Sequence, residues 1–296
     1  MRRQRKSILK PSKAVSKNRH SKPGVFFGRK MAQPFFSNEQ ILSKRYEKVR
    51  PFILTCDKRL DSFEKFVKSY NSISHCLLQP VLIMDDTTVS GSDRKRYHDL
   101  VIKLNPYVVI KQPQYSSNEL REWDPINFNL NKSKHNYLNV QKFMIKDFPD
   151  WALKYSDGPV LFLEDDILLS SYFPSGISEA LKHIDINADF ITMYANSRYK
   201  KYNRYKSYKF MHPINGNDYY GNLCILFSRK VISSLANNKE EVKSMSSAFD
   251  TRWGTYMQKR FYRMYETKIH YASHQPGYSS LDEGVWKDYR GEFFIK

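Results

Sequence analysis

The sequence contains no run of about 18 apolar residues, the length that a membrane-spanning helix requires, so we expect no transmembrane helix. No apolar segment follows the basic N-terminus, which argues against a secretory signal. Cysteine is scarce, and Cys56, Cys76 and Cys224 form an odd number without metal-type spacing. This pattern is typical of reduced thiols, and we therefore expect a cytoplasmic protein.

Two common nucleotide-binding signatures are also missing. The sequence contains neither the GxxxxGK-Ser/Thr pattern of a P-loop nor the GxGxxG pattern of a dinucleotide-binding turn. It contains no internal repeat either. The P-loop, dinucleotide-binding and repeat classes are therefore excluded.

Acidic residues are absent from two segments that hold most of the excess positive charge. The formal net charge is +19, from 49 Lys and Arg against 30 Asp and Glu. Residues 1–30 carry 11 basic residues and residues 198–212 carry six, and neither segment contains an acid. Without these 17, the other 32 basic residues nearly balance the 30 acids. Such concentrated charge indicates a polyanionic partner: nucleic acid, an anionic membrane surface or an acidic glycan.

Residues 1–35 are highly charged, contain scattered Pro and Ser, and show no periodicity. This composition predicts a disordered basic arm. The absence of interspersed acids favours an electrostatic tether to phosphates over a solubilising tail without a partner.

From residue 49 onward, buried-strand patterns alternate with helical ones. Strands are predicted at 49–55, 81–84, 107–111, 160–163, 190–194 and 223–227, with a further short strand within 263–271. Helices are predicted at 61–72, 90–104, 135–148, 177–184, 228–235 and 249–262. Segments 112–133 and 272–296 read as irregular. Crossovers of this kind require a mostly parallel sheet flanked by helices, so the fold class is α/β.

Polar residues follow several predicted strands. Asp57 and Arg59 come after the first, Asp85 and Asp86 after the second, and Glu164–Asp166 after the fourth. The carboxyl ends of parallel strands meet at one sheet edge, where α/β proteins bind ligands. Adjacent carboxylates need a positive partner, and hard oxygen ligands suit Mg²⁺ or Mn²⁺. The alternative is an acidic turn that ends the strand and caps the next helix.

Five segments, spanning roughly residues 50–285, resemble the nucleotide-sugar glycosyltransferases of GT-A fold. ILTCDKRLDSFEKFVKSY is similar to the first strand and loop of that family, and VLIMDDTT to the second strand. GPVLFLEDDILLSSYF resembles the metal-binding Asp-x-Asp segment in a Glu-Asp-Asp form. YYGNLCILFSRKVISSL resembles the segment beside the donor sugar, and HYASHQPGYSSLDE a C-terminal motif of some branching N-acetylglucosaminyltransferases. The basic arm, the insert 198–212 and the lack of an acid at position 167 depart from the family.

The resemblance implies a single GT-A-like domain over residues 36–296, with a donor half at about 50–170 and an acceptor half at 171–296. It implies that Asp166 binds Mn²⁺ or Mg²⁺, with His274 as a second ligand and His270 as its alternative. Glu164 or Asp165 would hold the ribose or a metal-bound water, and Glu164 is a further candidate metal ligand. The other candidate donor-binding residues are Thr55, Asp57, Arg59, Asp85, Asp86 and Gly221. Arg59 suits phosphate, but an ion pair with Asp57 or Asp61 is equally compatible with the sequence.

An inverting transfer requires a carboxylate that accepts the proton of the acceptor hydroxyl. Asp250 is the first candidate because bases of the family lie at a helix start there, and Asp282 is the second. The alternative for Asp250 is a helix N-cap. Tyr219 and Trp253 are candidates for the acceptor pocket, and core packing is the alternative for Trp253.

The insert 198–212 alternates basic and aromatic residues, as nucleic-acid grooves do. Its candidate contacts are Arg198, Lys200, Lys201, Arg204, Lys206 and Lys209. An interfacial segment on anionic lipid or glycan and a solvated hairpin are the alternatives. A DNA acceptor would require a flipped base, and a hydroxymethylated pyrimidine would supply the hydroxyl. That combination is typical of viral DNA modification and would place the protein in a host cytoplasm.

Three hypotheses remain from the sequence. The first is a metal-dependent hexosyl- or pentosyltransferase that uses a UDP-sugar and modifies hydroxymethylated bases in DNA. The second is the same enzyme class acting on a cell-surface, lipopolysaccharide or protein-linked glycan. The third is a non-catalytic nucleic-acid-binding protein on a transferase scaffold.

Overall fold

The computed structural model describes residues 46–56, 59–85, 91–130, 135–194, 208–216, 219, 223–245, 249–275, 277–278 and 285–286. The predicted basic arm, residues 1–35, lies outside these ranges. In the described part of the chain, a mostly parallel sheet carries helices on both faces, which confirms the predicted fold class.

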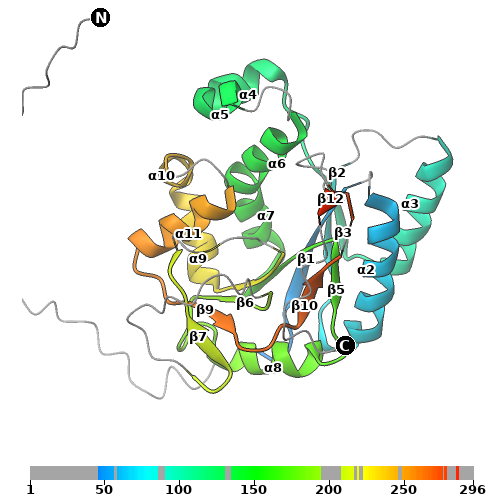
Figure 1. Cartoon of the computed structure of the whole chain (residues 1–296), viewed down its shortest axis with the longest axis vertical. Helices are drawn as coiled ribbons and strands as arrows, with labels where there is room; N and C mark the ends of the chain where they lie inside the picture. The colour runs from blue at the N-terminus through cyan, green and yellow to red at the C-terminus, as the bar shows by residue number, and fades with distance from the viewer. Residues whose placement is uncertain are drawn as a thin grey trace, which may run out of the picture.

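An eight-stranded sheet forms the centre of the molecule (Figure 1). Its strands follow the spatial order β3-β2-β1-β4-β8-β6-β9-β7. β1, β2, β3, β4, β6 and β9 run in one direction, whereas β8 and β7 are antiparallel to their neighbours. The bounds are β1 Arg50–Cys56, β2 Val81–Asp85, β3 Val108–Lys111, β4 Val160–Glu164, β6 Phe190–Thr192, β7 Met211–Pro213, β8 Cys224–Phe227 and β9 Met264–Thr267.

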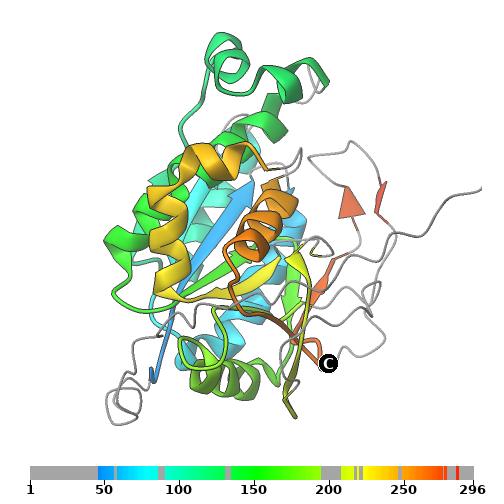
Figure 2. The ribbon, with the colours of Figure 1, turned by 90° about the vertical axis from the view of Figure 1, so that its left-hand side faces the viewer.

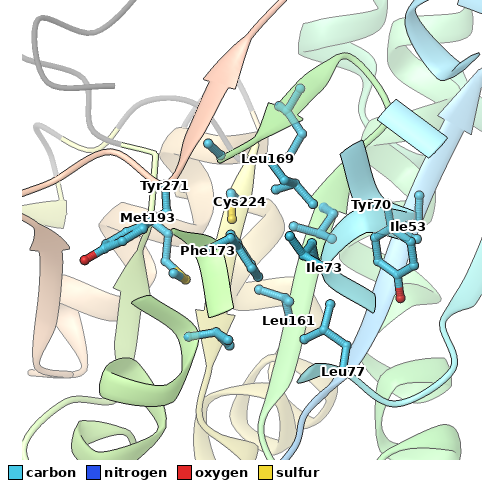
Figure 3. Close-up of a cluster of buried hydrophobic side chains, with 14 of the residues drawn as sticks. Ile53, Tyr70, Ile73, Leu77, Leu161, Leu169, Phe173, Met193, Cys224 and Tyr271 are labelled. Atoms are coloured by element: carbon cyan, nitrogen blue, oxygen red, sulfur yellow. The ribbon is translucent and has the colours of Figure 1, made fainter. Parts of the chain in front are cut away.

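Helices cover both faces because the inner strands are apolar on both sides, as parallel strands of α/β proteins are. In β4, Leu161 and Leu163 face one core layer, and Val160 and Phe162 face the other. The first layer includes side chains of α2 (Leu60–Ile73), α3 (Gly91–Leu104) and α8 (Phe173–His183). The second includes α6 (His135–Lys146), α7 (Phe148–Tyr155), α9 (Arg229–Asn237) and α11 (Phe249–Lys259). Figure 2 shows this arrangement from the side, and Figure 3 shows the first layer around Leu161, Cys224 and Tyr271.

Several elements were not expected from the sequence. Segment 112–133 was predicted to be irregular, but it contains α4 (Ser117–Trp123) and α5 (Pro125–Leu130). A capping box begins α4: the Ser116 hydroxyl accepts from the Glu119 amide, and the Glu119 carboxylate accepts from the Ser116 amide. α7 and α10 (Lys239–Lys243) were also missed, because both are too short to show a clear helical period.

The C-terminal segment, predicted to be irregular, also forms strands. β10 (Ala272–His274) pairs antiparallel with β5 (Ile167–Leu169), and β11 (Gly277–Tyr278) pairs with β12 (Val285–Trp286). A three-residue strand depends on a partner strand that is remote in sequence, so its own alternation of apolar and polar residues is too short to predict it. The β5–β10 pair is important because it brings the C-terminal segment to the acidic stretch.

Gly254 in α11 lies against Gly216 in the loop after β7. A Cβ at Gly254 would overlap the carbonyl oxygen of Gly216, which is a backbone atom and cannot rotate away. We expect Gly254→Ala to destabilise the protein by about 1–3 kcal/mol, because this overlap outweighs the better helix propensity of alanine. Urea denaturation measures the change, with Thr255→Ala on the same helix as the control. A Gly254→Ala variant as stable as the wild type would contradict the close contact.

Cys76 and Cys224 are free thiols. Burial raises the pKa of the Cys224 thiol far above its ordinary value, so this thiol stays protonated in the core. None of the helices in the described ranges has both the length and the apolar content that a membrane crossing needs.

Candidate active site

The carboxyl ends of three neighbouring strands meet at one edge of the sheet. Cys56 at the end of β1 pairs with Asp85 at the end of β2. On the other side of β1, Leu54 pairs with Glu164 at the end of β4. The amide of Asp165 then donates to the carbonyl of Leu54 at 3.1 Å, so the acidic turn leaves the sheet directly beside β1. The predicted convergence of polar strand ends is therefore observed for these strands.

Arg59 joins this edge from the start of α2. Its Nη2 lies 2.6 Å from Oδ1 of Asp165, and its Nη1 donates to Oδ2 of Asp166. Of the two ion pairs considered from the sequence, the one with Asp61 is not the arrangement seen, since Asp61 pairs with Arg96. Asp57 lies outside the described residues. The positive charge that the adjacent carboxylates require is supplied, in the described residues, by the Arg59 guanidinium.

His274 reaches the same carboxylate from β10. Its Nε2 lies 3.2 Å from Oδ2 of Asp166. His270, the alternative ligand, is buried and near His212 instead, and burial lowers the pKa of its imidazole. Of the two histidines, the structure therefore brings His274 to the acidic turn.

The charge state of Asp166 follows from this environment. Burial by itself would raise the pKa of its carboxyl group, but the charge of Arg59 and the hydrogen bond with His274 outweigh burial and lower that pKa well below its ordinary value. Asp166 is therefore a carboxylate at neutral pH. Its second oxygen, Oδ1, is buried and has no hydrogen-bond partner among the described residues.

Gln275 holds the C-terminal segment against this turn, a role that sequence reasoning missed. The backbone N–H of Gln275 donates to the backbone carbonyl of Asp166 at 2.7 Å. Its buried side-chain Nε2 donates to the backbone carbonyls of Ile167 and Ser62, each at 3.0 Å. One residue thus ties β10, the acidic turn and α2 together. The only sequence signal was the His-Gln pair within the C-terminal motif.

The residues present fit a divalent cation that is coordinated partly by the protein and partly by the phosphates of a bound molecule. Neighbouring ligand atoms of an octahedral Mg²⁺ or Mn²⁺, with bonds of about 2.1 Å, lie about 3.0 Å apart. The separation between His274 Nε2 and Asp166 Oδ2 is 3.2 Å, close to that spacing. The described ranges contain no group of three or more His, Cys, Asp or Glu side chains placed to hold one metal ion. Two protein ligands are what Mg²⁺ commonly takes when phosphates and waters complete its shell.

The described donor-site candidates Thr55, Asp85 and Glu164 lie at or near this edge. Thr55 is fully buried at the end of β1, where its hydroxyl accepts from the Tyr97 hydroxyl at 3.4 Å. Glu164 is half-buried, and its amide donates to the carbonyl of Leu223. Asp85 ends β2. The other donor-site candidates, Asp57, Asp86 and Gly221, lie outside the described residues.

The candidate bases are placed only in part. Asp250 is the second residue of α11, so its backbone is at a helix start, as predicted, and Asp282 lies outside the described ranges. Trp253 is fully buried among Phe148, Phe162 and Phe227, which is the core-packing alternative rather than an acceptor pocket.

Tyr219 is likewise buried. Its ring packs edge-on against Phe190, with 5.0 Å between ring centroids. The ring therefore contributes to the second core layer.

Most of the basic insert 198–212 also falls outside the described residues, including Arg198, Lys200, Lys201, Arg204 and Lys206. Lys209 is described and exposed. The end of the insert differs from the prediction, because Met211 and His212 belong to β7, which pairs with β9 in the central sheet. The segment that is separate from the sheet therefore ends before residue 211.

No protein-family model and no curated protein matches this chain. Similar solved structures include the mannosyltransferase PcManGT from Pyrobaculum calidifontis in complex with GDP-Man and Mn²⁺, with 12% identity and a TM-score of 0.42 over 74% of this chain and 54% of that one. Another is TarS residues 1–349 from S. aureus, with 13% identity and a TM-score of 0.42 over 77% and 60%. This chain therefore spans little more than half the length of either. These values are too low to assign an activity, which we infer from the site itself.

Proposed function

We propose that the protein is a metal-dependent glycosyltransferase that moves a sugar from a nucleotide-sugar donor to a hydroxyl acceptor. One observation carries this proposal: Arg59, Asp165–Asp166 and His274, from three segments that resemble glycosyltransferase motifs, meet in one network. These three segments are about 100 positions apart in sequence, yet they converge where open α/β sheets bind ligands.

Each residue has a defined task in this proposal. Asp166 and His274 hold Mg²⁺ or Mn²⁺, which, when bound, neutralises the diphosphate leaving group as a Lewis acid. Glu164, half-buried at the end of β4, contacts the donor ribose, because Asp165 is fully buried against Arg59. Asp250 accepts the proton of the acceptor hydroxyl from its position at the start of α11.

For the acceptor, we propose a hydroxymethylated base in DNA, with a cell-surface or protein-linked glycan as the alternative. The support is the composition of residues 1–30 and 198–212, which carry 17 basic residues and no acid. The basic insert follows β6 in sequence, and its end leads into β7 of the central sheet.

The test is a screen of UDP- and GDP-sugars with Mn²⁺, with duplex DNA that carries hydroxymethylated bases, or with plain glycans, as acceptors. Transfer is read as a mass shift of the acceptor, and donor hydrolysis as release of nucleoside diphosphate. We expect hydrolysis of at least one donor and its loss in EDTA. A well-folded protein that hydrolyses none of the donors would overturn the proposed activity.

A deletion of residues 198–207 tests the use of the DNA acceptor separately from the hydrolysis of the donor. It leaves β7 intact, whereas a longer deletion would remove a strand of the central sheet. We expect the deletion to abolish transfer to DNA and to leave donor hydrolysis unchanged. Transfer to DNA that survives the deletion would contradict the role of the insert.

A further inference from the structure

The Arg59 guanidinium occupies the position where the proposed metal site needs a positive charge. It bridges Asp165 and Asp166, and the three side chains are at most 11% exposed. Two adjacent buried carboxylates repel each other strongly, so the guanidinium is needed to keep both ionised when no other cation is bound. Among the described residues, Arg59 is therefore the guanidinium counter-ion of the acidic turn.

The same carboxylate oxygen is shared between Arg59 and the histidine. Oδ2 of Asp166 accepts from Nη1 of Arg59 and lies 3.2 Å from Nε2 of His274. A divalent cation held by that oxygen and that nitrogen would lie directly against the guanidinium. Positive charges at such a short separation repel each other, and burial from water strengthens the repulsion.

We propose that Arg59 is a displaceable counter-ion that leaves Asp166 when a divalent cation and a diphosphate bind together, and then pairs with the diphosphate. This inference rests on the proposed function. A guanidinium forms the same two-pronged hydrogen bonds with a phosphate as with a carboxylate, so the exchange replaces one partner by an equivalent one. Arg59 thus competes with the metal and supports the nucleotide, which makes the binding of the two ligands interdependent.

The position of Arg59 in the chain suits such a movement. It is the residue directly before the first residue of α2, and its side chain forms no cap of that helix. Leu60 and Phe63 then anchor α2 in the core. The side chain can therefore change partner while the backbone of the helix stays fixed.

The test compares Mn²⁺ binding with and without nucleotide in wild-type protein, Arg59→Met and Arg59→Lys. Free Mn²⁺ is measured by electron paramagnetic resonance, and UDP and GDP binding by calorimetry. Without nucleotide, we expect Arg59→Met to bind Mn²⁺ about tenfold more tightly than wild type, because the competing cation is gone. With Mn²⁺ present, we expect it to bind UDP or GDP about tenfold more weakly. The Mn²⁺ and nucleotide affinities of Arg59→Lys should fall between those of wild type and Arg59→Met.

Thermal unfolding supplies a second readout. Arg59→Met leaves two carboxylates without their counter-ion, so we expect a lower melting temperature and a larger increase on adding Mn²⁺ than in wild type. Arg96→Gln is the matched control, since Arg96 also bridges two carboxylates, Asp61 and Glu64, but at an exposed position. Its Mn²⁺ affinity should equal that of wild type.

The outcomes distinguish this inference from the proposed function. Unchanged or weaker Mn²⁺ binding by Arg59→Met would overturn the counter-ion role, whatever the enzyme activity. If Arg59→Met does not fold, unchanged Mn²⁺ binding by Arg59→Lys would overturn it equally. A wild-type protein that binds Mn²⁺ and nucleotide but hydrolyses no donor would refute the transferase and leave the Arg59 result standing.

Discussion

Replacing Asp166 with asparagine is expected to reduce donor hydrolysis by about a hundredfold to a thousandfold, or more. The asparagine side chain would keep the shape of the aspartate but lose the charge that binds a divalent cation and the second anionic partner of Arg59. We also expect nucleotide-dependent Mn²⁺ binding to be lost, because His274 alone is a weak site. Steady-state hydrolysis and Mn²⁺ titration with UDP or GDP measure the two effects.

The matched control for Asp166→Asn is Asp189→Asn. Asp189 is also a buried aspartate held by an arginine, with Nε and Nη2 of Arg263 at 3.1 and 3.0 Å from its oxygens. Asp189 directly precedes β6, whereas Asp166 follows the end of β4. Because β4 and β6 run in the same direction, the two aspartates lie at opposite ends of the strands. We expect Asp189→Asn to reduce stability but not hydrolysis per folded molecule. Near-wild-type hydrolysis by Asp166→Asn would remove Asp166 from the proposed site.

The second large effect concerns the stability of the helix that carries Asp250. Asp124, between α4 and α5, forms a buried ion pair with Arg252 of α11 and accepts two hydrogen bonds from Asn127. Breaking a buried ion pair by removing one partner typically costs about 3–5 kcal/mol, because the other charge remains buried. We expect a loss of this size for Asp124→Ala in urea denaturation, with reduced activity if α11 shifts.

A double-mutant cycle identifies the ion pair as the cause. The combined variant Asp124→Ala/Arg252→Met should be more stable than the sum of the single effects predicts, by about 0.5–3 kcal/mol. Additive effects would mean that the two residues do not stabilise each other.

The pH dependence of this ion pair has a defined sign. Burial would raise the pKa of the Asp124 carboxyl, but the hydrogen bonds from Asn127 and Arg252 outweigh it and lower that pKa. The stabilisation is therefore complete above the ordinary aspartate pKa of about 3.9 and is lost as the pH falls through the lower folded-state value. The destabilisation caused by Arg252→Met should shrink over the same acidic range.

The central strands were predictable because their pattern is strong and local. Val81–Met84 and Val160–Leu163 are short apolar runs that end in acids, and both form strands within one residue of the predicted bounds. The helix predicted at 61–72 is likewise observed as α2, which buries Phe63, Phe66 and Tyr70. A strand or helix can be predicted where the burial of one or two of its faces requires a regular pattern of apolar residues.

The elements that were missed depend on distant partners or on local capping. β5 and β10 are three residues each and exist as a pair that joins positions about 100 residues apart. α4 begins at a capping box in a polar segment where the apolar period is weak. The sequence left two alternatives for Trp253, the acceptor pocket and the core, because an aromatic residue in a helix does not show what it packs against.

The sequence by itself determined that three acids follow a buried strand and that adjacent carboxylates there need positive compensation, because both properties belong to neighbouring residues. Only the tertiary structure decided what compensates them. Arg59 and His274 reach Asp166 because α2 begins beside the acidic turn and β10 pairs with β5. Ion pairs between remote residues depend on how the elements pack, and no local pattern encodes that packing.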